Sequence, residues 1–209
     1  MSFERLAELL FPDVERDAEY YERLYPPRKL PEGAKVTRLA PSPTGFIHLG
    51  NLYGALTDER LAHQSGGVFF LRIEDTDAKR EVPNGTELIR SSLRSFGLNF
   101  DEGALEGGDR GDYGPYRQRQ RAQIYHTFAK KLVLEGKAYP CFCSEEELAE
   151  MRAEQEREKV NFGYYGKWAK YRDLPAEEAE CRIRAGQPYV LRFRSEGDPS
   201  HYLHLTDQI

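Results

Sequence analysis

The residues best suited to chemistry lie between residues 36 and 51, where an arginine precedes a proline-rich loop and a histidine precedes a glycine. Pro41 and Pro43 fix φ and favour extended geometry in the residue before them, so no helix is expected until after this loop. His48 and Gly50 would then lie at the start of a helix, whose free backbone N–H groups can bind a phosphate. Gly50 would let an anion approach the backbone closely. The stretch therefore predicts a strand, a stiff loop and a helix with a phosphate site.

A cluster of carboxylates follows a strand pattern further along the chain. Val68–Ile73 is a nearly continuous apolar, β-prone run, which is typical of a strand buried on both faces of a parallel sheet. It leads into Glu74-Asp75-Thr76-Asp77, whose carboxylates repel one another unless they are solvated, cap a helix or face cations. With a helix expected over residues 51–63, strand, helix and strand form a crossover unit that places ligands at the carboxyl ends of the strands. From the cluster alone, a bare acidic turn is an equally good interpretation.

Taken as one string, the first stretch resembles a known signature. In its glutamate-specific form, the first signature of class I aminoacyl-tRNA synthetases reads Arg-Phe-Ala-Pro-Ser-Pro-Thr-Gly, two residues, then His-Ile-Gly. This chain has Arg38, with Leu39 in place of the Phe, Leu49 in place of the Ile, and Asn51 where the signature ends in His. The run Arg-Ile-Glu-Asp-Thr-Asp, which ends at Asp77, is similar to glutamyl-tRNA synthetases too, and its distance from Arg38 fits that family. Two motifs in register carry the resemblance.

The resemblance implies an activity and a set of site residues. The activity joins ATP and L-glutamate into glutamyl-adenylate, with Mg²⁺ arriving with ATP, and then transfers glutamate to the 3′ end of tRNA(Glu). Arg38 would pair with the side-chain carboxylate of glutamate, and Glu74 would accept from its α-ammonium group. No protein nucleophile is required, because catalysis is positioning plus electrostatic stabilisation. The implied residues are Arg38, Ala40, Ser42 and Glu74 for glutamate, Thr44, His48 and Gly50 for ATP, His48, Gly50 and Asn51 for catalysis, and Thr76 and Asp77 for the tRNA 3′ end.

The resemblance also implies a fold class and a division of the chain. The fold class is α/β, a Rossmann-type class I synthetase nucleotide-binding fold, present in part, with an inserted α+β connective domain and an N-terminal helical arm. Because the arm precedes the usual start of the family, a packing appendage is its preferred interpretation. The expected segments are 1–33 for the arm, 34–104 for the first half of the catalytic domain, 105–195 for the insert that holds the tRNA acceptor end, and 196–209 for the start of the return to the catalytic domain.

Hydrophobic periodicity predicts the remaining elements. Helices are expected over residues 2–25, with an interruption at Pro12, and over 86–96, 116–136, 144–160 and 176–185, the 144–160 helix beginning with a capping box of Ser144 and Glu147. Strands are expected over 34–40, 138–143, 189–194 and 201–205, and a loop over 107–112. The candidate core positions are Leu52, Ala55, Leu56 and Leu61 in the 51–63 helix and Ile124, Phe128, Leu132 and Val133 in the 116–136 helix. The apolar positions of the 86–96 helix are Leu88, Ile89, Leu93 and Phe96.

The cysteines raise the question of structural zinc. Cys141 and Cys143 form a pair of the kind that binds zinc in some glutamyl-tRNA synthetases and in their glutamyl-queuosine relatives. Tetrahedral zinc needs four ligands. Tyr171 stands where those relatives often have a cysteine, and Cys181 is the one other cysteine of the chain. Structural zinc is therefore not expected, and a site completed by a tyrosine and Cys181 is the alternative.

The composition is that of a soluble chain of 209 residues with a mean hydropathy of −0.72. No apolar run is long enough to span a bilayer, and three cysteines fit a reducing cytoplasm, so a cytoplasmic protein without a membrane partner is expected. The net charge of −5 argues only weakly against a nucleic-acid partner, because local basic patches hold such partners. The aromatic and basic segment 161–172 fits base stacking or the core of a small insert, and the core is preferred for Trp168. The sequence leaves the oligomeric state open.

The second class I signature, Lys-Met-Ser-Lys-Ser or a variant, is absent from these residues. We therefore expect an N-terminal fragment of a glutamyl-tRNA synthetase, with little or no aminoacylation by itself. One alternative is a glutamyl-queuosine tRNA(Asp) synthetase, against which the incomplete cysteine site and the arm count mildly. The other is a non-catalytic tRNA-binding module, which would have no glutamate site.

Overall fold

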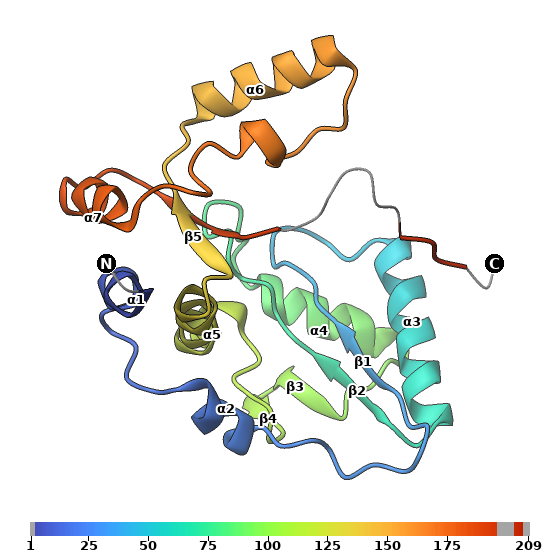
Figure 1. Ribbon diagram of the computed structural model, residues 1–209. Helices are drawn as coiled ribbons and strands as arrows, with labels where there is room; N and C mark the ends of the chain where they lie inside the picture. The colour runs from blue at the N-terminus through green and yellow to red at the C-terminus, as the bar shows by residue number, and fades with distance from the viewer. Residues whose placement is uncertain (1–2, 196–202, 207–209) are drawn as a thin grey trace. The chain divides into compact units, whose positions relative to one another are not determined.

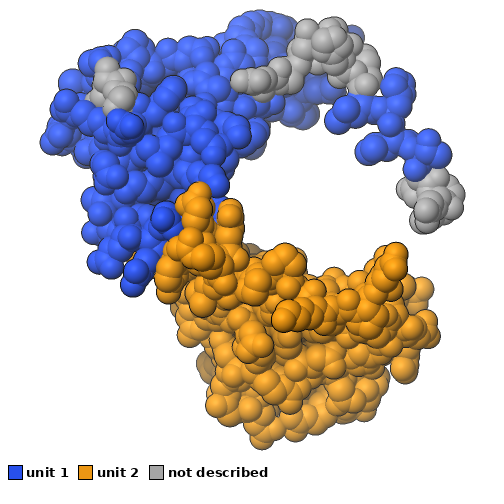
Figure 2. Space-filling model, turned by 60° about the horizontal axis from the view of Figure 1, so that its bottom comes forward, with its two compact units in different colours: residues 1–17, 126–209 blue, residues 18–125 orange. Residues whose placement is uncertain are grey.

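The chain forms two compact units. In the computed structural model, which describes residues 3–195 and 203–206, unit 1 contains residues 1–17 and 126–209, and unit 2 contains residues 18–125 (Figure 2). The domain limits expected from the sequence were drawn from the family resemblance, whereas these two units are defined by compactness. The expected limits therefore stay a prediction. Among the described helices, none is long and apolar enough to cross a membrane.

Unit 2 is built on a four-stranded sheet (Figure 1). Its strands, in their order across the sheet, are β1 (Val36–Leu39), β2 (Val68–Leu71), β3 (Glu102–Leu105) and β4 (Gly108–Arg110). β1, β2 and β3 are parallel, which confirms the predicted strand-helix-strand unit. β4 is antiparallel to β3 and lies inside residues 107–112, so the prediction of a simple loop there was wrong. Gly107 and Gly108 both have positive φ, which lets the chain turn tightly enough for hairpin pairing.

Helices α3 (Leu49–Gln64) and α4 (Gly85–Ser95) supply the main apolar cluster of unit 2. α3 packs against β1 and β2. The cluster joins Ala55 and Ala62 of α3 to Phe69 of β2 and to Ile89 and Leu93 of α4. Burial of these side chains is the main source of stability for this unit, at about 25 cal/mol per Å² of apolar surface removed from water. The buried positions Ala55, Ile89 and Leu93 agree with the predicted apolar faces.

Several apolar side chains of the predicted helices are exposed, and Leu56, Leu61 and Phe128 among them were expected at core positions. On α3, the buried residues are Ala55, Glu59 and Ala62, which follow one helical stripe, and leucines at positions 56 and 61 fall outside it. The sequence offered two overlapping stripes, and packing against the sheet selected the one with small residues. The exposed side chains are Leu56, Leu61, Leu88, Phe96 and Phe128.

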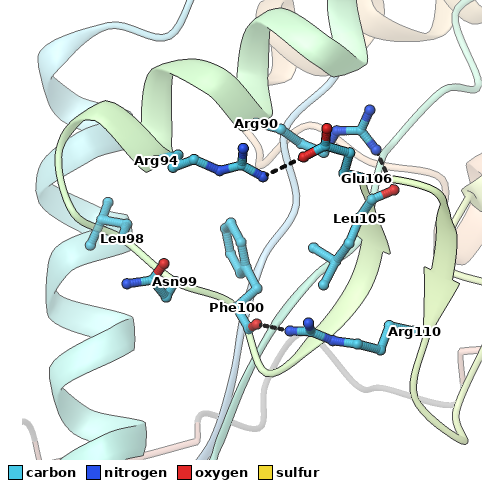
Figure 3. A pocket seen from close by; sticks show the side chains of 8 residues that line it. All are labelled: Arg90, Arg94, Leu98, Asn99, Phe100, Leu105, Glu106 and Arg110. Carbon is cyan, nitrogen blue, oxygen red and sulfur yellow. Dashed lines mark hydrogen bonds and ion pairs between the residues drawn. The ribbon is translucent and has the colours of Figure 1, made fainter.

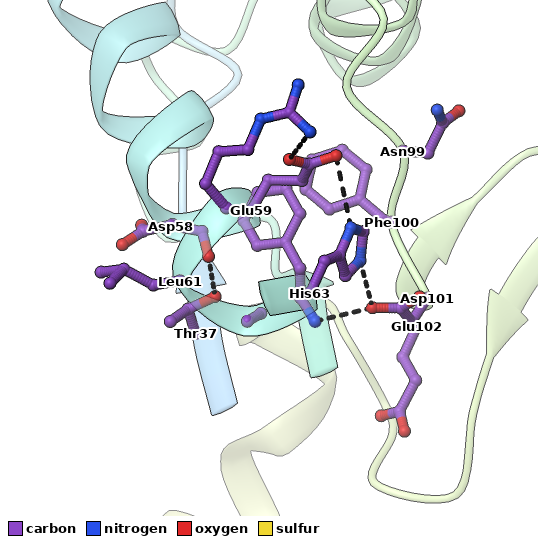
Figure 4. A network of polar contacts seen from close by, with 12 residues as sticks. Thr37, Asp58, Glu59, Leu61, His63, Asn99, Phe100, Asp101 and Glu102 are labelled. Carbon is purple, nitrogen blue, oxygen red and sulfur yellow. Dashed lines mark hydrogen bonds and ion pairs between the residues drawn. The ribbon is translucent and has the colours of Figure 1, made fainter. Parts of the chain in front are cut away.

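A polar network holds the end of α3 to the sheet (Figure 4). The imidazole of His63 lies between two carboxylates, with its Nδ1 3.3 Å from Glu59 Oε1 and its Nε2 3.0 Å from Asp101 Oδ2. The same Asp101 oxygen accepts the backbone N–H of Phe69 at 2.8 Å. Thr37 donates its hydroxyl to the backbone carbonyl of Asp58 at 2.7 Å. A buried carboxylate such as that of Glu59 is costly without a partner, and His63 together with Arg60, whose Nη1 lies 3.5 Å from Glu59 Oε2, supplies the partners.

A second network fixes the segment after α2 (Ala18–Leu24) to the outer part of the sheet. Arg28 donates from both terminal nitrogens to the carboxylate of Glu102, one of these bonds being 2.7 Å long. Tyr116 donates its hydroxyl to Glu102 at 2.7 Å and accepts the backbone N–H of Tyr113 at 3.1 Å. The guanidinium of Arg28 lies 3.7 Å from the centre of the Tyr113 ring. Within unit 2, the second part of the arm is thus held to the sheet by part-buried hydrogen bonds.

This second network should make stability depend on pH in two ranges. The bond from Arg28 lowers the pKa of Glu102, so its contribution is present above the ordinary carboxyl pKa of about 4.5 and is lost as pH falls. Burial, followed by the bond to Glu102, raises the pKa of Tyr116 from 10.0 to about 12, so its contribution is present below pH 10 and is lost as pH rises toward 12.

We therefore expect Tyr116→Phe to lower the free energy of unfolding by about 1.5–3 kcal/mol at neutral pH, because it removes the hydrogen bond to the Glu102 carboxylate and the acceptor of the Tyr113 N–H. Urea unfolding of the parent chain and the variant at several pH values measures this. The difference between them should shrink as pH rises from 10 toward 12. A difference that stays constant across that range would contradict a role for the Tyr116 proton.

Unit 1 combines a two-stranded sheet with helices. β5 (Ala138–Cys141) pairs antiparallel with β6 (Val190–Phe193), which confirms both predicted strands. The helices are α1 (Phe3–Leu10), the greater part of α5 (Ala122–Leu134), α6 (Glu145–Glu158) and α7 (Ala176–Arg184), with the 3-10 turn η2 (Gly166–Trp168). The 3-10 turn η1 (Gln118–Arg121) precedes α5 in the chain. The core contains Leu6, Ala7, Leu10, Val133, Ala138, Phe142 and Ala179, so α1 packs as the preferred interpretation of the arm requires.

Two local predictions are confirmed in unit 1. Glu147 donates its backbone N–H to Ser144 Oγ at 3.2 Å, and Ser144 donates its own to Glu147 at 2.9 Å, which is the predicted capping box. Trp168 is buried, as preferred for the core of a small insert. Of the strand predicted over 201–205, residues 201 and 202 lie outside the described residues, and residues 203–205 have no regular secondary structure.

The three cysteines of unit 1 are free thiols. Cys141 is buried and donates its thiol to the hydroxyl of Tyr164 at 3.3 Å, while Cys181 is exposed on α7. Burial, reinforced by Glu147, raises the pKa of Cys143 to about 11, which keeps that thiol protonated at neutral pH. The tyrosine hydroxyl that is bonded to Cys141 is that of Tyr164. The expectation that structural zinc is absent stays a prediction.

Candidate active site

The proline-rich loop is fixed to the carboxyl ends of the strands by backbone bonds. Pro41 accepts the N–H of Glu74 at 3.0 Å, and Pro43 accepts the N–H of Val82 at 2.9 Å. Pro43 is fully buried, and a Cβ added at Gly85 would lie 2.7 Å from its carbonyl oxygen. Only glycine therefore fits at position 85 without a shift of the loop. The loop that carries Ala40 and Ser42 is thus held beside Glu74.

At the end of the loop, His48 is the N-terminal capping residue of α3 and is exposed. Its backbone N–H is accepted by the side-chain oxygen of Asn51 at 3.3 Å, so Asn51 has a structural role that its place in the signature did not suggest. A Cβ at Gly50 would lie 3.2 Å from the His48 ring, which means that a larger residue would press on the imidazole. His48 and Gly50 accordingly lie together at an exposed helix start, which favours an anion.

Arg38 and Glu74, from neighbouring strand ends, meet directly. Arg38 Nη1 lies 3.0 Å from Glu74 Oε1, and their side chains are 39% and 23% exposed. Arg72 also donates to this oxygen, at 2.8 Å from both Nε and Nη2. Two guanidinium groups thus share one carboxylate at the strand edge. Arg72 was not among the predicted site residues, although its position two residues before Glu74 on an extended chain places both on one side.

The rest of the acidic cluster is tied to the chain around it. The buried carboxylate of Asp75 accepts the backbone N–H of Arg119 at 2.9 Å, and Arg119 Nε donates to the Asp75 carbonyl at 2.5 Å. Asp77 accepts from Arg80 Nε at 2.6 Å, and this bond lowers the pKa of Asp77. Thr76 is exposed. Arg119 therefore fastens the acidic turn, a role that neither of the two motifs predicted.

In chemical terms, the carboxyl ends of β1 and β2 hold a cation and an anion in contact, next to an exposed helix start. A ligand with a carboxylate and an ammonium group can replace this contact by pairing with each partner separately. An anionic group such as a phosphate suits the N-terminus of α3. The arrangement fits an amino acid beside a nucleotide, at the strand edge where α/β sheets bind their ligands.

Comparison with known proteins agrees with this arrangement. Residues 35–209 match the family model of tRNA synthetases class I (E and Q), catalytic domain, and the chain therefore belongs to this family of class I synthetases. More particularly, it is similar to glutamate-tRNA ligases. The ligase of Acetivibrio thermocellus is 58% identical over 210 residues, which cover 100% of this chain and 38% of that protein. The ligase of Sorangium cellulosum is 44% identical, over 96% of this chain and 38% of that protein.

Solved structures give the same result. The glutamate-tRNA synthetase of Elizabethkingia anophelis has a TM-score of 0.66 and 39% identity, over 77% of this chain and 33% of that one. A glutamate tRNA ligase of Elizabethkingia meningosepticum, solved in complex with its amino acid, has a TM-score of 0.65 and 40% identity, over 78% of this chain and 32% of that one. The fold class expected from the sequence is therefore confirmed.

The chain spans about 38% of the length of the curated relatives it matches most fully. The Acetivibrio relative aligns with all of the present chain, including the arm before residue 35, where the family model begins. The match to that relative thus extends over the arm, which lies outside the residues that the family model matches.

Proposed function

We propose that this chain supplies the amino-acid pocket and part of the ATP site of a glutamate-tRNA ligase. The observation that carries the proposal is the contact between Arg38 and Glu74 at the ends of parallel neighbouring strands, beside the start of α3. A substrate with a carboxylate side chain and an α-ammonium group presents the matching charges. The similarity to glutamate-tRNA ligases over the whole chain favours this substrate over the alternatives.

In the proposed complex, the side-chain carboxylate of L-glutamate pairs with Arg38, and its α-ammonium group pairs with Glu74. The contact between Arg38 and Glu74 must open first, and a partly exposed ion pair of this kind is worth about 1 kcal/mol or less. Each new charge-assisted bond contributes about 1.5–3 kcal/mol. Substrate binding therefore outweighs the pair it replaces. Ala40 offers backbone groups and Ser42 a hydroxyl from the loop between the strands.

ATP is proposed to bind with its phosphates at the start of α3, near Thr44, His48 and Gly50. Mg²⁺ would arrive with ATP, bound to its phosphates. An oxygen of the glutamate α-carboxylate attacks the α-phosphate, the bond to the β-phosphate breaks, and pyrophosphate leaves. The chain contributes position and charge stabilisation to this in-line step.

The second step is transfer of the glutamyl group to the 3′ end of tRNA(Glu), which we place near Thr76 and Asp77. Asp77 is half-buried and bonded to Arg80, whereas Thr76 is exposed. Of the two, Thr76 is therefore the more accessible to RNA. We expect the protein to act in the cytoplasm, where tRNA is charged.

Calorimetry with L-glutamate tests the proposed pocket. The chain should bind L-glutamate, and Arg38→Ala should weaken binding by roughly 10- to 100-fold, because one charge-assisted bond of about 1.5–3 kcal/mol is lost. L-Glutamine, which lacks the side-chain charge, should bind the parent chain more weakly than L-glutamate by a similar factor. The control is Arg152→Ala, which removes an exposed arginine of α6 in unit 1. Absence of glutamate binding by the parent chain would favour a non-catalytic module instead.

A further inference from the structure

Away from the strand ends, unit 2 contains a polar cavity of about 300 Å³ between α4 and the β3–β4 hairpin (Figure 3). Arg90 and Arg94 line it from α4, and Arg110 lines it from β4. Leu98 and Phe100 add apolar surface. None of the residues assigned to the glutamate and ATP sites lines this cavity.

Two of the three guanidinium groups are held in place by backbone carbonyls. Arg90 donates to the carbonyl of Leu105 and to the carboxylate of Glu87. Arg110 donates from Nε to the carbonyl of Asp101 at 3.1 Å, and from Nη2 to the carbonyl of Phe100. A carbonyl fixes the direction of a guanidinium without cancelling its charge. These groups are therefore preorganised for an anion, which reduces the entropy lost on binding.

The charges around the cavity are not balanced. Three arginines line it, together with one carboxylate, that of Glu106. Glu87, which does not line the cavity, pairs with Arg90, so one positive charge remains in excess. Glu106 pairs with Arg94 at 2.8 Å, and the side chains of this pair are 68% and 66% exposed. Such a pair can exchange for a ligand at little cost. Within the described part of the chain, Arg90 Nε is also buried and has no hydrogen-bond partner, which is unusual for a buried donor.

We propose that this cavity binds a small organic phosphate. Phosphate carries more than one negative charge and matches the planar fork of arginine, which suits a site with several guanidinium groups. The volume of about 300 Å³ is at the lower end of the range for small-molecule pockets and exceeds the needs of a bare ion. Leu98 and Phe100 would cover an apolar body. On binding, the phosphate displaces Glu106 from Arg94.

Phenyl phosphate is a suitable probe, because it combines a phosphate with an apolar ring and resembles neither glutamate nor ATP. Nuclear magnetic resonance titration of the chain at constant ionic strength should shift signals of Arg94, Phe100 and Arg110. Inorganic phosphate should bind about tenfold more weakly than phenyl phosphate, and benzyl alcohol should not bind. The proposal would be overturned if phenyl phosphate caused no shifts at these residues. It would also be overturned if tRNA fragments bound at this cavity and phenyl phosphate did not.

Paired variants separate this site from a general effect of charge. Glu106→Gln removes the competing carboxylate and should strengthen phenyl phosphate binding by roughly threefold to fivefold, since an exposed pair contributes little. Arg94→Gln should weaken it by at least about tenfold. The control, Arg152→Gln in unit 1, should leave it unchanged. Unchanged or weaker binding by Glu106→Gln would overturn the proposed exchange. Glutamate binding should be the same in all three variants, so failure here is distinguishable from failure of the proposed function.

Discussion

Replacing Glu74 with glutamine is expected to weaken L-glutamate binding by roughly 150-fold, which corresponds to about 3 kcal/mol. Glutamine keeps the size of the side chain but cannot pair its charge with the α-ammonium group of the substrate. In the parent chain, Arg38 and Arg72 both contact one oxygen of the Glu74 carboxylate. In the variant they would face a neutral amide instead. The dissociation constant from calorimetry measures the effect. Arg80→Gln, which removes an exposed arginine bonded to Asp77, is the control and should leave glutamate binding unchanged.

Arg72 should act through Glu74, so its replacement is informative in the same experiment. Arg72 holds the carboxylate of Glu74 with two nitrogens, both at 2.8 Å, and this fixes the direction in which Glu74 accepts. We expect Arg72→Gln to weaken glutamate binding by about tenfold, and by less than about twofold when Glu74→Gln is already present. If the losses of binding free energy in the two single variants added up in the double variant, Arg72 would not act through Glu74.

The second large effect concerns the core of unit 2. Leu93 of α4 is 0% exposed, whereas Leu56 of α3 is 42% exposed. Leu93→Ala should therefore lower the free energy of unfolding of unit 2 by about 2–5 kcal/mol, because it leaves a cavity between α4, Phe69 and Ala55. Leu56→Ala, the same chemical change on a neighbouring helix, should cost less than about 1 kcal/mol.

Urea unfolding, with amide hydrogen exchange of residues 18–125 to isolate unit 2, measures both variants. The comparison tests which stripe of α3 and α4 faces the sheet. Equal losses for the two leucines would contradict the burial seen here and would restore the core face expected from the sequence of α3.

The sequence by itself determined much of the local structure. The strands over 36–39 and 68–71, the capping box at Ser144 and the break of the arm near Pro12 follow from short-range patterns, which act within a few residues. The two motifs identified the family, because their residues are contiguous. Within a helix, however, local periodicity did not choose between overlapping apolar stripes. In α3 the predicted core positions mixed Leu52 and Ala55 with Leu56 and Leu61. Contact with β1 and β2 buries Ala55 and Ala62 and leaves the leucines at positions 56 and 61 exposed.

The candidate site shows the same division. Contiguous signatures proposed Arg38, His48 and Glu74, and these roles remain proposals. The contact between Arg38 and Glu74 joins residues 36 positions apart, and that between Asp75 and Arg119 joins residues 44 positions apart. The tertiary structure also paired residues 108–110 with β3, where their glycines had suggested a loop. Motifs report which residue types are present. Strand pairing and burial decide which charges meet and which donors stay unpaired, and both are settled only when distant segments pack together.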